Sequence, residues 1–324
     1  MADSHVSRLC TTQHALGTHM KAPSNLIDLT RLVCRGHAEK LADAMNRLLR
    51  HPDEEAVHDV RVTCRRLRVV IKMIEPLYRK RMIRAARGRF RDLLRVLGPI
   101  RDAEVLGERA KALSEQTPHA GLLELARLFN AQAEFERIKA VAAVDRRNFI
   151  TLPRLLEALL VSPAISAQAE EKYREKSLSK FAFRQLSEHL DNIDQYADLG
   201  ADSAPEDLHE LRIEFKKLRY TAEFFQPALP LKPLIKATTK FQELLGDLHD
   251  TDVALHTFTP CLRRTHSAAS ADPASVDTAL RDLVASATEQ NRSLRQAFAA
   301  KWTTENRHAL RQALDEVNVI NQPA

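Results

Sequence analysis

Two stretches of this chain repeat the same order of apolar and basic residues. Residues 57–68 read VHDVRVTCRRLR and residues 208–219 read LHELRIEFKKLR, an offset of 151. A second pair follows in the same order, LGPIRDAEV at 97–105 and LGDLHDTDV at 245–253, an offset of 148. Ordered self-similarity of this kind indicates a duplicated structural unit. We therefore predict two copies of one fold, related by a pseudo-two-fold axis.

The fold class predicted from composition is all-α. Only 8 of the 324 residues are glycine, whereas Ala, Leu, Arg and Glu, which cost least in a helix interior, are abundant. Long alternating runs of β-branched residues are absent, so no sheet is expected. Together with the repeat, this pattern predicts two antiparallel helical bundles.

The expected organisation is a disordered leader at 1–24, a first repeat at 25–165 and a second at 166–324. Helical patterns cover 25–49, 57–78, 81–97, 121–149, a short stretch within 151–167, 173–196, 208–225 and 234–245. Gly98-Pro99 and Gly246 are expected to end helices, the first through a left-handed cap. Asp102 and Glu104, and likewise Asp250 and Asp252, would then occupy the first turns of the helices that follow.

The location of the protein follows from what the chain does not contain. The four cysteines form no CxxC pair, which argues against a zinc site or a disulfide framework and favours a reducing interior. The first 24 residues lack the apolar core of a secretory signal. No apolar run reaches 18 residues, so no membrane span is predicted. We expect a cytoplasmic protein.

Positive charge is concentrated in one part of the chain. Between His58 and Arg101 there are 14 Lys/Arg and three acids, although the whole chain carries only +6. On a helix, one side of the first repeat block presents a set that we call the first basic row: His58, Arg61, Arg65, Arg68 and Lys72. A separate apolar stripe consists of Val60, Cys64, Leu67, Ile71 and Ile74.

The second block repeats this arrangement. Its second basic row is His209, Arg212, Lys216 and Arg219, and its apolar stripe is Leu211, Phe215, Leu218, Ala222 and Phe225. Arg66 and Lys217 flank the two rows. A further basic helix follows each block, with Arg84, Arg87, Arg91 and Arg95 in the first repeat and Lys232, Lys236 and Lys240 in the second.

Cations at i+3 and i+4 repel one another, and solvated helix faces normally mix charges of both signs. A polyanion lying along the rows would relieve that repulsion, and Arg binds phosphate oxygens in a bidentate manner. Four basic helices that share one surface would form a groove for a long linear anion. A merely solvated charged face is the alternative. A metal site at the histidines and first-turn carboxylates is a weaker one, because the arginines would repel the ion.

These residues resemble the CHAD domain, the conserved-histidine α-helical domain. The resemblance is carried by HxxRVxxRRLR at 58–68, HxLRxxxKKLRY at 209–220, and the LGxxRD and LGxxHD turns at 97–102 and 245–250. It extends over nearly the whole chain after about residue 25. It implies two pseudo-symmetric helical bundles around a basic cavity or pore that binds inorganic polyphosphate.

The resemblance also implies association with polyphosphate granules and no catalysis by this domain. Recruitment of other granule proteins through the same site is a further possibility, and we expect no cofactor and no metal. Carried over position by position, it assigns binding roles to His58, Arg61, Arg65, Arg66, Arg68, His209, Arg212, Lys216, Lys217 and Arg219. The periodicity alone adds Lys72, Arg84, Arg87, Arg91, Arg95, Lys236 and Lys240.

Two other functions could use the same basic faces. A nucleic-acid-binding protein would neutralise phosphates in the same way. Against this function, aromatic residues make up 5% of the chain and no helix-turn-helix, zinc-finger or RRM signature occurs. An enzyme acting on phosphate chains would require a P-loop, a carboxylate cage for Mg²⁺ or an activated nucleophile, and no such motif is found.

Overall fold

The described chain is all-helical. The computed structural model describes residues 23–78, 80–161, 171–173, 177–262 and 273–320, and no strand occurs in these ranges. The helices are α1 (Leu26–Arg50), α2 (Glu54–Met73), α3 (Lys80–Val96), α4 (Gly98–Gln116), α5 (Ala120–Arg146), α6 (Leu152–Val161), α8 (Leu178–Asp194), α9 (Pro205–Phe225), α10 (Lys232–Leu262), α11 (Pro273–Lys301) and α12 (Thr304–Ile320). Two short 3₁₀ helices are η1 (Glu75–Leu77) and η2 (Phe149–Thr151). The predicted all-α class is confirmed.

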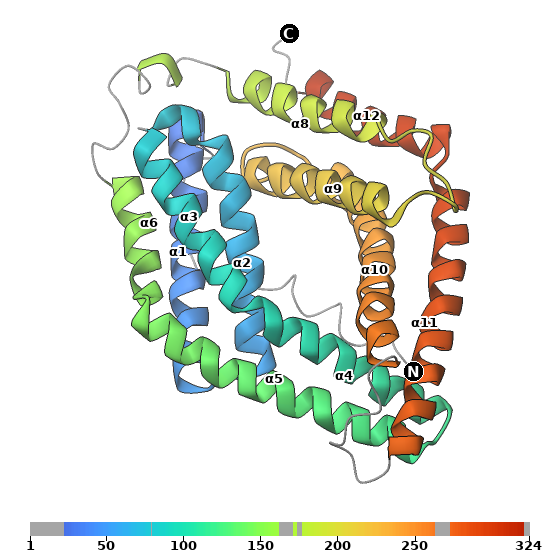
Figure 1. Cartoon of the computed structure of the whole chain (residues 1–324). Coiled ribbons are helices and arrows are strands. Elements are labelled where there is room, and N and C mark those ends of the chain that lie inside the picture. Colours follow the sequence, from blue (N-terminus) through green and yellow to red (C-terminus); the bar gives the residue numbers. More distant parts are fainter. Residues whose placement is uncertain (1–22, 79, 162–170, 174–176, 263–272, 321–324) are drawn as a thin grey trace.

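The helices surround a central region on four sides (Figure 1). One side consists of α1, α2, α3 and α6, the next of α4 and α5, the third of α10 and α11, and the last of α8, α9 and α12. α2 contacts α9, and α5 contacts α11, so helices of the first half of the chain meet helices of the second half in both pairs. The predicted leader, apart from its last two residues, and the junction at 165/166 lie outside the described residues, and the duplication itself stays a prediction.

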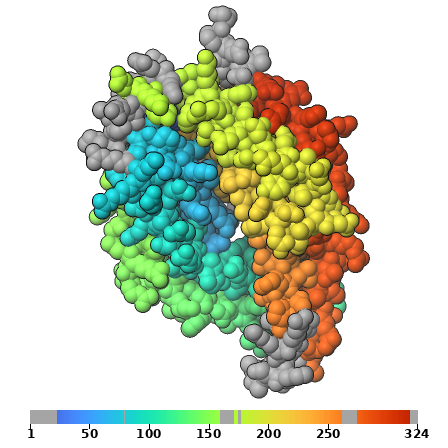
Figure 2. All heavy atoms as spheres, turned by 45° about the horizontal axis from the view of Figure 1, so that its top comes forward, coloured from blue at the N-terminus to red at the C-terminus, as the bar shows by residue number. Residues whose placement is uncertain are grey.

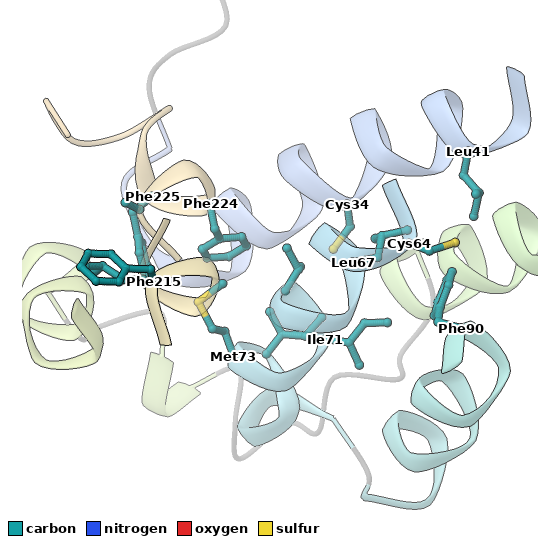
Figure 3. Close-up of a cluster of buried hydrophobic side chains, with 14 of the residues drawn as sticks. Cys34, Leu41, Cys64, Leu67, Ile71, Met73, Phe90, Phe215, Phe224 and Phe225 are labelled. Carbon is teal, nitrogen blue, oxygen red and sulfur yellow. The ribbon is translucent and has the colours of Figure 1, made fainter. Parts of the chain in front are cut away.

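The two predicted apolar stripes are both buried, which confirms the helix faces assigned to the core. All ten of their side chains are at most 2% exposed. Figure 3 shows Cys64, Leu67 and Ile71 of α2 within the main apolar cluster, and Phe224 of α9 beside Met73 at the end of α2. This apolar contact fixes α2 against α9 and leaves their polar faces for the site described below.

The start of α2 is set by a cap that the periodicity did not reveal. Asp53 is the N-cap, and its carboxylate accepts a hydrogen bond of 2.7 Å from the Ala56 amide. The helix therefore begins at Glu54, three residues before the predicted start at Val57. An N-cap carboxylate satisfies an amide that would otherwise have no partner.

The structure at Gly98 differs from that at Gly246, and neither matches the predicted helix end. At Gly98 the chain does change direction, but no glycine in the described ranges has a positive φ, so the expected left-handed cap is wrong. Gly98 and Pro99 instead begin α4. Gly246 ends no helix, because α10 continues through it from Lys232 to Leu262. The position after Gly246 is Asp247, which retains the backbone N–H that Pro99 lacks and so allows the helix to continue.

The four acids expected in first turns lie deeper in their helices. Asp102 and Glu104 follow Gly98 by four and six residues, and the first turn of α4 contains no acid. Asp250 and Asp252 lie in the middle of α10. Glu104 accepts a 3.0 Å hydrogen bond from Arg137, so its role is to join α4 to α5. The positions of these four acids are therefore not explained by the helix dipole.

Candidate anion-binding site

Three cavities follow one another along the faces of α2, α9 and α10. The first, the α8 cavity, has a volume of about 420 Å³ and is lined by Arg65, Arg68, Val69, Lys72, Met73, Arg87, Gln185, Glu188, His189, Ile213, Lys216, Lys217 and Tyr220. The second, the α4 cavity, has a volume of about 240 Å³ and is lined by His58, Arg61, Val62, Arg65, Arg101, Asp102, Val105, Arg212, His249, Asp250 and Val253. The third, the α11 cavity, of about 510 Å³, lies among α4, α10 and α11 and includes Arg101, Glu108, Arg109, Asp250, Phe258 and Gln290.

Shared side chains place these cavities next to one another, and we call the series of three the channel. Arg65 lines both the α8 and the α4 cavity. Arg101 and Asp250 line both the α4 and the α11 cavity. Figure 2 shows the surface hollowed between the blue and teal helices of the first half and the yellow and orange helices of the second. Walls from both halves therefore enclose the channel.

Every member of the first basic row lines the channel. His58 and Arg61 face the α4 cavity, Arg68 and Lys72 face the α8 cavity, and Arg65 faces both. Arg61 also has a structural contact, because it is only 9% exposed and donates a 2.8 Å hydrogen bond to the Leu97 carbonyl. The end of α3 is thereby tied to α2.

The second basic row is only partly in the channel. Arg212 lines the α4 cavity, and Lys216 and its neighbour Lys217 line the α8 cavity. Arg219 lines none of the three cavities. The central members of the two rows meet in these cavities, because Arg65 lines the α8 cavity together with Lys216 and the α4 cavity together with Arg212.

The cations at the centre of the channel lack carboxylate partners. Within the described chain, no ion pair involves Arg65, Arg212 or Lys216, and the buried Nε of Arg212 has no hydrogen-bond partner. Burial, followed by repulsion from Arg212 and Arg65, lowers the pKa of Lys216 to about 7. Burial and the adjacent Arg65 lower the pKa of Arg61 to about 10. An added anion would relieve this repulsion.

The histidines of the two rows are held toward the neutral form by their surroundings. Burial and then the Arg101 charge lower the pKa of His58, and burial and then Arg212 lower that of His209. His209 lies against His249, with 3.1 Å between their Nδ1 atoms. Burial and Arg212 lower the pKa of His249 to about 4.

Three of the binding residues that the resemblance assigned are paired with a carboxylate: Arg66, Arg219 and Lys217. Glu223 of α9 accepts hydrogen bonds of 2.9 Å from Arg66 of α2 and from Arg219 of its own helix. Both arginines are thus neutralised where α2 and α9 meet, and neither lines the three cavities. Lys217 is ion-paired with Glu214, although it still lines the α8 cavity.

The helices that follow the rows contribute little to the channel walls. Arg87 lines the α8 cavity and is 3.5 Å from the Glu75 carboxylate. The other predicted residues of these helices are exposed and line none of the three cavities; they are Arg84, Arg91, Arg95, Lys236 and Lys240. Arg95 is 3.2 Å from Asp92, which is also 3.9 Å from Arg91.

The channel also contains residues that the sequence reasoning passed over. His249 is one of these residues, because it lines the α4 cavity and contacts His209. Its counterpart at the offset of 148 is Arg101, which lines the same cavity. The aligned turns LGPIRD and LGDLHD carried this signal. Tyr220, Glu188 and His189 of the α8 cavity gave no comparable signal.

Three further properties of the described residues concern metal binding, membranes and cysteines. Among them, no group of three or more His, Cys, Asp or Glu side chains is arranged to hold a metal ion. No described helix is long and apolar enough to cross a membrane. Cys34 and Cys64 are buried free thiols, and burial raises the pKa of each to about 12.

Comparison with known proteins identifies the family. The model of the CHAD domain matches residues 33–259, a range that includes both basic rows and both LG turns. The chain belongs to the CHAD domain family. The resemblance stated from the repeat motifs is thereby confirmed, and it carries the general association of CHAD domains with the binding of phosphate chains.

Two solved structures share the fold. The CHAD domain from the plant Ricinus communis matches with a TM-score of 0.60 and 22% identity, over 93% of this chain and 95% of that one. PptA from Streptomyces chartreusis matches with a TM-score of 0.62 and 15% identity, over 90% of this chain and 100% of that one. At these identities the likeness concerns the fold alone.

Relatives in sequence include two uncharacterized proteins of Mycobacterium tuberculosis, MT2285 and Rv2226. Each is 29% identical to this CHAD protein over 218 residues, which cover 64% of this chain. The aligned region spans 41% of the length of these curated relatives.

Proposed function

We propose that this CHAD protein binds inorganic polyphosphate in the channel between α2, α9 and α10. The observation that carries the proposal is the set of inward-facing cations without carboxylate partners, Arg65, Arg212 and Lys216. Burying like charges together is costly unless a counter-charge is present. A chain of phosphates supplies one negative charge after another along a line, which matches the linked cavities.

The pattern of charge pairing supports this proposal over a solvated surface. Arg66 and Arg219, at the contact of α2 with α9, share the Glu223 carboxylate. Arg65 is adjacent to Arg66 in sequence but lines both the α8 and the α4 cavity, where it has no such partner. Among the described residues, Arg66 and Arg219 outside the channel are thus neutralised, whereas Arg65, Arg212 and Lys216 inside it form no ion pair.

We further propose that binding proceeds without chemical conversion and that the protein is cytoplasmic and associates with polyphosphate granules. Activation of a water or phosphoryl group would require a metal or an activated nucleophile. The prominent groups of the channel are guanidinium and ammonium donors, which bind and orient anions. Incubation with polyphosphate and Mg²⁺ should therefore release no inorganic phosphate.

The decisive experiment is a titration with long-chain polyphosphate at several salt concentrations. The Arg65→Glu/Arg68→Glu variant should lose at least about 100-fold in affinity, since each replacement removes a charge-assisted contact and adds repulsion. The Arg35→Glu/Lys40→Glu variant changes the net charge equally at exposed positions of α1, away from the channel, and is the matched control. Equal losses of affinity in the two variants would mean that only the net charge of the protein matters, and would refute binding in the channel.

Competition separates polyphosphate from nucleic acid as the ligand. Long-chain polyphosphate should displace a DNA oligonucleotide from the protein readily, whereas DNA should displace polyphosphate poorly. The reverse order would assign the basic rows to nucleic-acid binding. Circular dichroism of each variant establishes that the helices are intact.

A further inference from the structure

The charge of the channel falls steadily from one end to the other. The α8 cavity is lined by six Lys/Arg and one carboxylate, that of Glu188. The α4 cavity is lined by four arginines and two carboxylates, and the α11 cavity by two arginines and two carboxylates. The net charge of the lining residues therefore attracts a linear anion most strongly at the α8 end of the channel. At the α11 end the charges of the lining residues cancel, so net charge gives no attraction there.

The two carboxylates of the α4 cavity are Asp102 and Asp250. They occupy matched places in the LGPIRD and LGDLHD segments, one on α4 and the other on α10. Within the described chain, neither forms an ion pair or a hydrogen bond, although four arginines line the same cavity. These acids are therefore not structural partners of the arginines, in contrast to Glu223.

The two acids influence each other and the surrounding cations. Burial is the main cause of the raised pKa of Asp102, and the nearby Asp250 charge raises it further. The positive charges of Arg61 and Arg65 act in the opposite direction. Both carboxylates nevertheless line an otherwise basic cavity, where a phosphate oxygen would meet them.

We propose that Asp102 and Asp250 limit the number of phosphate units of the chain that are bound tightly. This inference rests on the proposed function. A chain binds first in the α8 cavity, and the two carboxylates weaken the contacts of the phosphate units that continue past Arg65 into the α4 cavity. The acids act as specificity-determining residues, because they reduce the affinity gained from each added phosphate unit beyond the α8 cavity.

The test compares chain lengths in the Asp102→Asn variant. Asp102 is the better choice because Asp250 also raises the pKa of Lys216, which is about 7, so that removal of Asp250 would also lower the charge of this lysine. For long-chain polyphosphate at low salt we expect about three- to tenfold tighter binding, the size of one unit-charge repulsion across a partly hydrated site. The gain should be clearly smaller for tripolyphosphate, which is short enough to lie in the α8 cavity.

The control is Asp43→Asn, which changes the net charge identically at an exposed position of α1. It should leave both affinities as in the wild type. Unchanged or weaker binding of the long chain to Asp102→Asn would overturn the inference, as would an equal gain for both chain lengths. Absence of polyphosphate binding by the wild type would instead refute the proposed function, so the two failures are distinguishable.

Discussion

For the proposed binding of polyphosphate, we expect Lys216 to make the affinity depend on pH in a range where an exposed lysine would stay fully charged. Burial and the charges of Arg212 and Arg65 lower its pKa to about 7 in the empty channel. A bound phosphate chain adds negative charge beside the ammonium group and raises that pKa again. Binding therefore takes up protons, and the affinity is highest below about pH 7 and falls as the pH rises through this value.

The size of the effect follows from the fraction of Lys216 that is charged. With a pKa near 7, about nine tenths is protonated at about pH 6 and only about 3% at about pH 8.5. If the complex keeps the lysine charged throughout, the affinity falls by about 30-fold over this range, or about 2 kcal/mol. At about pH 7, binding should take up about half a proton.

Isothermal titration calorimetry in two buffers of different ionisation enthalpy measures both quantities. The Lys216→Arg variant is the control, because a guanidinium stays charged across this range. Contributions from His58, His209 and His249, whose pKa values are all lowered, are retained in the variant and cancel in the comparison. Identical pH profiles for wild type and Lys216→Arg would refute the reasoning.

Three further outcomes are expected. In parallel titrations, the Arg65→Gln variant should lose about tenfold or more in polyphosphate affinity, and the Arg66→Gln variant less than about threefold. Comparable losses would contradict the assignment of Arg65, and not Arg66, to the channel. Glu223→Gln should lower the free energy of unfolding by about 1–3 kcal/mol in urea titrations, because two half-buried arginines lose their counter-charge; an unchanged midpoint would count against this role. Asp247→Pro should cost about 3 kcal/mol or more, whereas Asp247→Ala should be nearly neutral, because only proline interrupts α10; similar values for both would contradict the explanation given for that helix.

The parts of the fold that depend on local sequence were predictable. The burial of Cys64, Leu67 and Phe215 follows from helical spacing alone, and so does the alignment of the first basic row on one face of α2. The length of α10 was not predicted, because Gly246 resembles Gly98 until the following residue is considered. A glycine permits a helix end, but the proline after it determines the end.

The parts of the site that depend on distant contacts could not be predicted. Arg65 and Arg66 are indistinguishable by residue type and lie in the same helix. Only the packing of α9 against α2 shows that Arg66 meets Glu223, 157 positions further along the chain. The contact of His209 with His249 likewise joins two helices whose relative position no periodicity specifies.

Because α2 and α9 come from opposite halves of the chain, the channel exists only while those halves are in contact. A phosphate chain lying between Arg65 and Lys216 would therefore be a non-covalent cross-link, held by one half on each side. Binding of the anion and association of the two halves are then thermodynamically linked, so that any change that separates the halves must also release the anion.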